Sequence, residues 1–173
     1  MIVSLIANPC NKTIPERRTE LANYAAKTDV QSDKSRIEIE RTLERYGATH
    51  FGYMSEPGSA TVAFRMDDRQ VRFSLPLPPK DSREFTHHSR GARTASAAAA
   101  EYEQAIRQKW RALSLVVKAK LEAVASGIAE FDQEFFAYVV LPSGQTVYEQ
   151  THEQVSRMIS SQTPGPLMLE GKK

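Results

Sequence analysis

The side chains of this chain that could do chemistry are concentrated in one short run, REFTHHSRGARTAS, at positions 83–96. The run holds two adjacent histidines, His87 and His88, and places Arg90 and Arg93 on either side of a glycine. These residue types fit three kinds of segment: a histidine-based metal or hydrolytic site, an arginine clamp for an anion, or a connecting loop with neither activity.

The histidine chemistry lacks the ligands and nucleophiles that it needs. Zinc sites take three or four protein ligands at defined spacing, whereas Glu84 with the two histidines gives only ExxHH in a segment without helical period. The chain has one cysteine, Cys10, and no phosphate-loop, GxGxxG, HExxH or GxSxG motif. The sequence therefore predicts no enzyme, no metal and no cofactor, and a hydrolase that uses His87 or His88 remains an alternative.

The anion clamp fits the residue types better. Thr94 or Ser96 is a typical N-cap, and the alanine-rich stretch that follows predicts a helix. A helix N-terminus offers free N–H groups and the positive end of the helix dipole, and guanidinium groups suit bidentate phosphate contacts. We therefore expect Arg90 and Arg93 to contact an anion, with an exposed, non-binding loop as the alternative.

The long helix predicted at residues 94–131 has two distinct sides. Apolar residues at three- and four-residue steps predict its core side, namely Ile106, Trp110, Leu113, Val117, Leu121, Val124, Ile128 and Phe131. A second side carries Arg107, Arg111, Ser114 and Lys118. Residues 83–120 hold eight Lys or Arg against three Asp or Glu, a local charge of +5. The second side is either a basic ridge for a polyanion or a solvated flank.

The segment before the loop predicts a three-stranded antiparallel meander. Three runs between residues 49 and 75 alternate apolar and polar side chains. If the two aspartates at 67–68 form the second turn, the apolar residues of neighbouring strands meet on one face, in the pairs Phe64–Val71 and Val62–Phe73. The opposite face is polar and carries Arg65 and Arg72.

These elements predict an α+β fold. A single domain at 34–160 follows a loosely attached N-terminal arm at 1–33 and precedes a tail at 161–173. The domain comprises a short helix, the meander, the long helix packed on the sheet, and a C-terminal hairpin with a short helix. The expected core is Val62, Phe64, Val71, Phe73, Trp110, Leu113, Val117 and Leu121.

Two finer expectations concern the ends of the domain. The first helix is predicted to begin near Ser32 or Asp33, to end at a glycine, and to bury Ile37, Leu43 and Tyr46. At the other end, residues 136–141 and 146–148 are expected to pair as a hairpin. A capping box of Thr151 and Gln154 is then expected to open the last helix.

The bulk composition favours a globular protein of the cytoplasm. The net charge of +2 is too small to demand a polyanionic partner by itself. A single cysteine favours a reducing compartment. The apolar run at residues 2–7 is too short for a signal sequence, and no stretch approaches the roughly 20 apolar residues of a membrane span.

The runs KSRIEIERTLERYGATHFGYM, ATVAFRMDDRQVRFSLPLP and EYEQAIRQKWRALSLVVKAKLEAV resemble a group of small phage and prophage proteins of unassigned activity. The resemblance covers residues 34–155, implies a phage or mobile-element setting, and carries over no site residue. Separately, three antiparallel strands followed by one long helix are similar in order to the core of the Rad52/RecT-type single-strand annealing proteins. That resemblance implies oligomeric rings or filaments that hold DNA in a basic groove.

The leading prediction is a non-enzymatic, phage-type accessory protein that binds nucleic acid, with single-stranded DNA favoured, in annealing or recombination. Such contacts to phosphates are independent of sequence and sensitive to salt. The residues expected to make them are Arg90, Arg93, Arg107, Arg111, Lys118, Arg65 and Arg72. The alternative is a protein–protein interaction module, either a phage inhibitor of a host protein or a small assembly subunit that forms a homo-oligomer.

Overall fold

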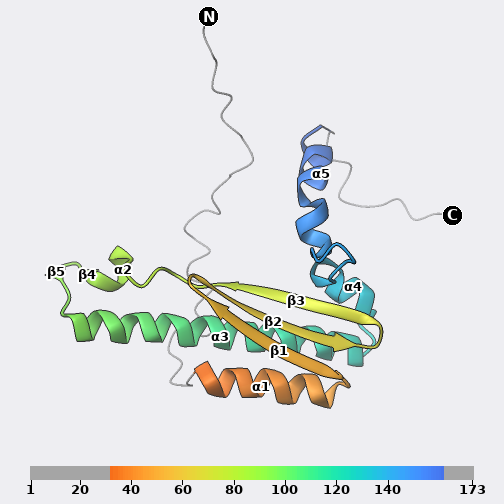
Figure 1. Ribbon diagram of the computed structural model, residues 1–173, viewed down its shortest axis with the longest axis horizontal. Helices are drawn as coiled ribbons and strands as arrows, with labels where there is room; N and C mark the ends of the chain where they lie inside the picture. Colours follow the sequence, from red (N-terminus) through yellow and green to blue (C-terminus); the bar gives the residue numbers. More distant parts are fainter. Residues whose placement is uncertain (1–31, 162–173) are drawn as a thin grey trace, which may run out of the picture.

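The structure is a computed structural model, and it describes residues 32–161. The predicted arm and tail therefore lie almost wholly outside the described residues. The elements follow in the order α1 (Ser32–Arg45), β1 (His50–Glu56), β2 (Ser59–Met66), β3 (Arg69–Pro76), α2 (Arg83–Thr86), β4 (His87–His88), β5 (Gly91–Ala92), α3 (Ala95–Ala125), α4 (Phe131–Phe135), η3 (Phe136–Tyr138) and α5 (Val147–Ser161). This is the α+β arrangement that the sequence predicts, with the long helix packed on the sheet (Figure 1).

The three-stranded sheet has the predicted order and register. Strands β1, β2 and β3 pair as antiparallel neighbours, and Phe64 lies opposite Val71. The turn between β2 and β3 consists of two aspartates, and Asp67 takes a left-handed conformation with φ of 49°, which aspartate tolerates better than most residues. Because side chains alternate along a strand, this register puts every large apolar residue of β2 and β3 on one face.

Two helices cover that apolar face. Figure 1 shows α1 and α3 side by side along the sheet, and contacts between Glu38 and Arg111 and between Tyr46 and Glu122 show that they run parallel. All eight residues predicted for the core are buried. Two residues of α1, Ile39 and Leu43, join the same cluster.

The buried side of α1 differs from the prediction at one position. Leu43 is fully buried and Tyr46 packs partly against the core, but Ile37 is 46% exposed and Ile39 takes the buried place. The reason is the position of α3 beside α1, which draws Ser35 and Thr42 to the covered side and turns Ile37 outward. The sequence of α1 alone does not indicate on which side a second helix lies.

The long helix α3 begins as predicted and ends earlier than predicted. The Thr94 side chain accepts a hydrogen bond from the N–H of Ala97 (3.3 Å) and caps the helix. At the other end Gly127, with φ of 71°, donates to the Val124 carbonyl, and Ile128 donates to the Ala123 carbonyl. This pair of bonds is a Schellman motif. It ends the helix before Ile128, which is 80% exposed instead of buried.

The segment after α3 closes the core with a helical turn and a short hairpin. Phe135 of α4 is fully buried, with its ring edge-on to Phe64 (5.9 Å between centroids). The predicted hairpin is present but shorter, because it begins only at Val139 and pairs Val140 with Thr146. Residues 136–138 are helical instead, since one helical side brings Phe131, Phe135 and Tyr138 to the core together.

A capping box opens α5 five residues before the predicted one. The N–H of Glu149 donates to Thr146 Oγ1 (3.2 Å), and the Glu149 carboxylate accepts from the N–H of Thr146 (2.7 Å). The predicted pair lies inside the helix, where the Thr151 hydroxyl donates to the Val147 carbonyl (2.7 Å). Both Thr-x-x-Glu and Thr-x-x-Gln satisfy the capping-box pattern, and the hairpin decides between them because it ends at Thr146.

Replacement of Leu43 by alanine tests the packing of α1. Leu43 is 0% exposed, so Leu43→Ala should lower the free energy of unfolding by about 2–5 kcal/mol. Ile37→Ala, on the outward side of the same helix, should cost less than about 1 kcal/mol. Urea denaturation measures both values, and equal losses for the two variants would contradict the placement of α1.

The capping box predicts that α5 loosens in acid. The N–H of Thr146, with Arg72, holds the pKa of Glu149 below its ordinary value of 4.5. A lowered pKa means that the ionised carboxylate stabilises the fold above pH 4.5, and that this stabilisation disappears as the pH falls through the folded-state pKa. The protection factors of the α5 amides, which are corrected for the intrinsic pH dependence of exchange, should fall over that acid range in the wild type. In Glu149→Gln the protection factors should be lower at neutral pH and nearly independent of pH, whereas matching protection-factor profiles would refute the role of the carboxylate.

Candidate nucleic-acid interface

Basic residues line the outward side of α1. Lys34, Arg41 and Arg45 are separated by seven and four residues, so they project from one side of the helix. The opposite side carries Ile39 and Leu43, which the sheet buries. The burial of the apolar side therefore fixes the direction of the three basic side chains.

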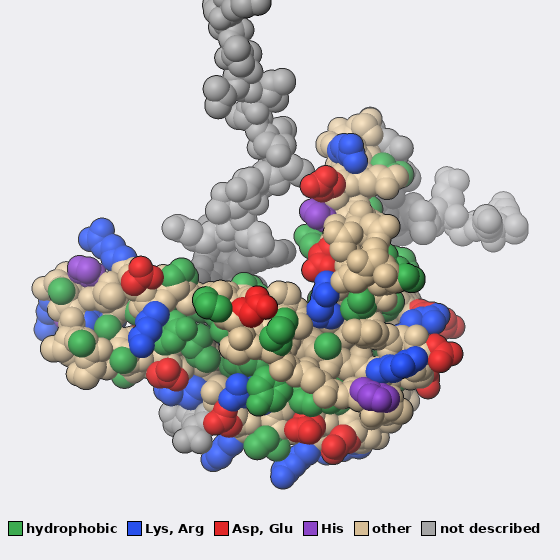
Figure 2. Space-filling model, viewed as in Figure 1, with side chains coloured by type: hydrophobic (Ala, Val, Ile, Leu, Met, Phe, Trp, Pro, Cys, Tyr) green, Lys and Arg blue, Asp and Glu red, His purple; other side chains and the backbone are tan. Residues whose placement is uncertain are grey.

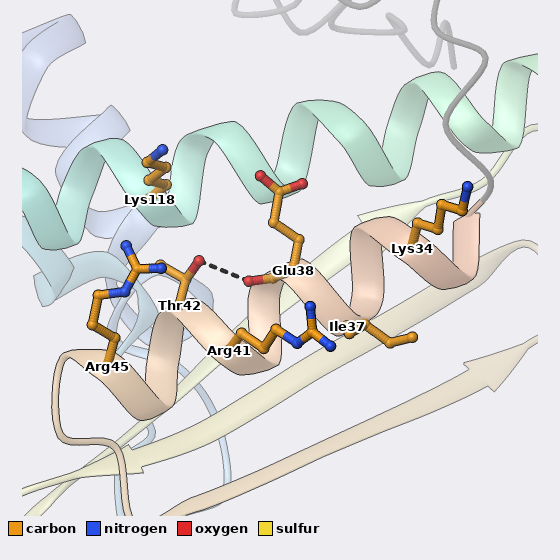
Figure 3. Close-up of a pocket in the computed structure, with 7 residues that line it drawn as sticks. All are labelled: Lys34, Ile37, Glu38, Arg41, Thr42, Arg45 and Lys118. Atoms are coloured by element: carbon orange, nitrogen blue, oxygen red, sulfur yellow. Dashed lines mark hydrogen bonds between the residues drawn. The ribbon is translucent and has the colours of Figure 1, made fainter.

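The packing of α3 beside α1 turns this basic side into a groove. Lys118 of α3 faces the end of α1, and the groove between the two helices has a volume of about 540 Å³. Figure 3 shows Arg45 and Lys118 at one end, Lys34 at the other, and Glu38 between them with its carboxylate directed towards α3. The groove, which we call the α1–α3 groove, is lined by Lys34, Ile37, Glu38, Arg41, Thr42, Arg45 and Lys118.

One ion pair ties the two walls of the groove together. A guanidinium nitrogen of Arg111, on α3, donates to a carboxylate oxygen of Glu38, on α1. Both side chains are partly buried, with 28% and 37% of their surface exposed. The pair is neutral as a unit, so it leaves the charge of the other cations uncompensated.

The four remaining cations of the α1–α3 groove have no acidic partner within residues 32–161. Six ion pairs occur in this part of the chain, and none includes Lys34, Arg41, Arg45 or Lys118. Four like charges that lie together without an ion-pair partner create a positive potential that attracts anions. The groove is therefore suited to bind an extended anion.

The structure brings three of the predicted site residues to this region. Lys118 lines the α1–α3 groove, and Arg111 is paired with Glu38, one of its lining residues. Arg107 lies one turn before Arg111 on α3, where its guanidinium donates to Gln104 Oε1 (2.5 and 3.1 Å). That this side of the long helix acts as a basic ridge stays a prediction.

The predicted anion clamp at the start of α3 has a different structure. The Arg93 guanidinium donates to the carbonyls of Glu84 (2.7 Å) and His87 (2.5 Å), and one of its nitrogens lies 3.9 Å from Glu101. Arg93 therefore holds the turn of α2, β4 and β5 together. Arg90 is exposed in the tight turn between β4 and β5, where its N–H donates to His88 Nδ1 (2.9 Å).

The two arginines of the open sheet face lie on the side of the sheet away from the α1–α3 groove. Arg72 forms an ion pair with Glu149 of α5 (2.6 Å). Arg65 is exposed and borders a shallow depression of about 350 Å³ together with His50 and Gln70. In Figure 2, basic and acidic side chains are interspersed over the described part of the visible face, without a continuous basic field.

The sequence interpretation assigned no role to Lys34, Arg41 and Arg45 of the first helix. A signal was nevertheless present: positions 34, 38, 41 and 45 recur at helical steps on the side opposite Ile39 and Leu43. Only the packing of α1 against α3 distinguishes a groove from a solvated side.

The described residues contain no cluster of three or more His, Cys, Asp or Glu side chains that could hold a metal ion. His87 and His88 are exposed, and each contacts its own loop, through Thr86 (3.0 Å) and the Arg90 N–H. No helix in residues 32–161 has the length and apolar character to cross a membrane.

Comparison with known proteins gives no relative for the chain. No protein-family model, no curated protein and no solved structure matches it. The resemblance to small phage and prophage proteins and to the single-strand annealing core stays a prediction.

Proposed function

We propose that the protein binds the phosphate backbone of a nucleic acid, without catalysis and without reading base sequence, in the α1–α3 groove. The observation that carries the proposal is the convergence of four cations from two helices with no acidic partner among the described residues. Arg and Lys side chains neutralise phosphates and release condensed counterions, which supplies most of the affinity in sequence-independent binding.

The dimensions of the groove suit a chain of phosphates. Lys34 and Arg45 are eleven residues apart on α1, a distance of roughly 16 Å along the helix axis. A single phosphate cannot contact cations at both ends of such a groove, whereas a nucleic-acid strand can. The groove is small, with a volume of about 540 Å³, and we favour single-stranded DNA over a duplex.

The lining also indicates that the groove does not contact the bases. Among residues 32–161, no aromatic side chain lines it, and the one apolar lining residue is Ile37. Stacking on aromatic rings is the usual way to hold the bases of a single strand, so contacts in this groove fall on phosphate and sugar. A phage setting and a role in annealing or recombination rest on the sequence resemblance alone.

Removal of two groove cations tests the proposal. Fluorescence anisotropy with a labelled oligothymidylate of about 20 nucleotides, between roughly 50 and 200 mM salt, gives the slope of log affinity against log salt. Four phosphate contacts to a single strand predict a slope near −3 for the wild type. Arg41→Gln/Arg45→Gln should reduce the slope by about 1.4 and the affinity at low salt by at least about tenfold.

A matched control separates the groove from net charge. Lys80→Gln/Arg157→Gln removes the same two charges from exposed positions away from the groove, and it should leave the slope nearly unchanged. Undetectable binding of the wild type at low salt would refute the proposed function, and equal losses for both double variants would refute its placement.

A second candidate function, self-association, is favoured by the apolar side of α5. Figure 1 shows α5 standing away from the sheet, and among the described residues only its first residue, Val147, is buried. Tyr148, Val155, Met158 and Ile159 form an exposed stripe along it. The charged residues Glu153 and Arg157 lie on the opposite side of the helix. Two copies of α5 can therefore pair antiparallel without placing like charges against each other.

Light scattering on the full chain tests this self-association. A stripe of four residues is small against the surface that a stable dimer buries, so we expect a dimer only at concentrations of roughly 10 µM or above. Val155→Glu should keep the protein monomeric, and Arg157→Glu, on the opposite side, should leave the dimer intact. A wild type that stays monomeric throughout would exclude the second copy as the partner of α5.

A further inference from the structure

The α1–α3 groove contains an acid at its centre. Glu38 is its one carboxylate among the described lining residues, and the cations stand on both sides of it. Figure 3 shows its carboxylate directed across the groove towards α3 rather than away into solvent. A carboxylate in that place occupies the position to which the surrounding cations would attract a phosphate oxygen.

The partner of Glu38 is suited to exchange one anion for another. Arg111 donates to Glu38 through one terminal nitrogen, while a guanidinium group carries five N–H donors in a planar fork. Such a fork binds carboxylate and phosphate with similar geometry. Because both side chains are partly exposed, the replacement of one oxyanion by the other does not require that the two helices separate.

We propose that Glu38 is a built-in competitor of the bound phosphate, which occupies Arg111 in the free protein and yields it when a nucleic-acid strand enters the groove. The inference rests on the proposed function and concerns the selectivity of the same site. Glu38 neutralises one of five cations and repels an incoming anion. It therefore lowers the affinity of the groove for every anion, and it lowers the affinity for a single phosphate more than the affinity for a strand.

This competition selects polymeric phosphates over single ones. An isolated phosphate ion must displace Glu38 from Arg111 without being held in the groove by contacts to other cations. A strand already held by Lys34 and Arg45 presents its middle phosphates to Arg111 at a high effective concentration, so the exchange becomes intramolecular. The substrate class is accordingly a nucleic-acid strand, and inorganic phosphate or a mononucleotide is rejected.

The test is the isosteric replacement Glu38→Gln, with Glu40→Gln as its matched control. Glu40 is exposed on the same helix, does not line the groove, and carries the same charge. In the anisotropy assay with oligothymidylate, Glu38→Gln should raise affinity about tenfold and steepen the salt slope by about 0.7, the increment of one added phosphate contact. Glu40→Gln should change affinity less than about twofold, since its carboxylate is exposed, screened by solvent and does not line the groove.

Two further measurements complete the test. Inorganic phosphate, at constant ionic strength, should displace the oligonucleotide more effectively from Glu38→Gln than from the wild type. Arg111→Gln should weaken binding more in the Glu38→Gln background than in the wild type, because only there is Arg111 free before binding. Thermal denaturation of each variant confirms that it is folded.

The outcomes separate this inference from the proposed function. If the wild type binds with the expected salt slope but Glu38→Gln and Glu40→Gln have equal affinity, the competitor role is refuted. The proposed binding of a strand in the groove is then still supported. If Glu38→Gln binds more weakly than the wild type, Glu38 holds Arg111 in place for the ligand, and the competitor role is again refuted. If the wild type does not bind at all, both proposals fail.

Discussion

The apolar face of a three-stranded sheet is the constraint on which the rest of this molecule depends. Val62 and Val71 at its centre are inaccessible to solvent, and the side chains that cover them come from α1 and α3. A sheet of three short strands has no second layer of strands to bury that face, so helices must do so. Leu43 of α1 and Val117 of α3 are fully buried there, which fixes the two helices side by side.

The groove is a consequence of that packing rather than a separate feature. Once Ile39 and Leu43 face the sheet, the residues on the opposite side of α1 must face outward next to α3. Natural helices usually disperse such exposed cations among acids, as the five ion pairs elsewhere in residues 32–161 do. Here a single acid, Glu38, is committed to Arg111 in the opposite wall. The ion pair thus links the two helices and, under the proposed function, sets how strongly an anion is held between them.

Local sequence signals predicted much of the fold. The two-residue aspartate turn gave the register of β2 and β3, Thr94 marked the start of α3, and the apolar stripe gave the core. The signals did not predict features of the fold that depend on contacts between residues far apart in the chain. The outward position of Ile37 depends on α3, and the choice of Thr146 as the cap of α5 depends on the hairpin. The site residues show a further limit: the arginines of the 83–96 run are visible in the sequence, but the sequence does not show that Arg93 bonds to its own loop.

The central claim is that an extended anion occupies the space between α1 and α3, and amide NMR spectra of the labelled protein during titration with oligothymidylate test it most directly. The account predicts shifts concentrated on the outward side of α1 and on α3 near Arg111 and Lys118, with the turn that contains Arg90 and the open sheet face around Arg65 unaffected. Shifts that concentrate at the Arg90 turn or on the sheet face, or spectra that do not change at low salt, would contradict it.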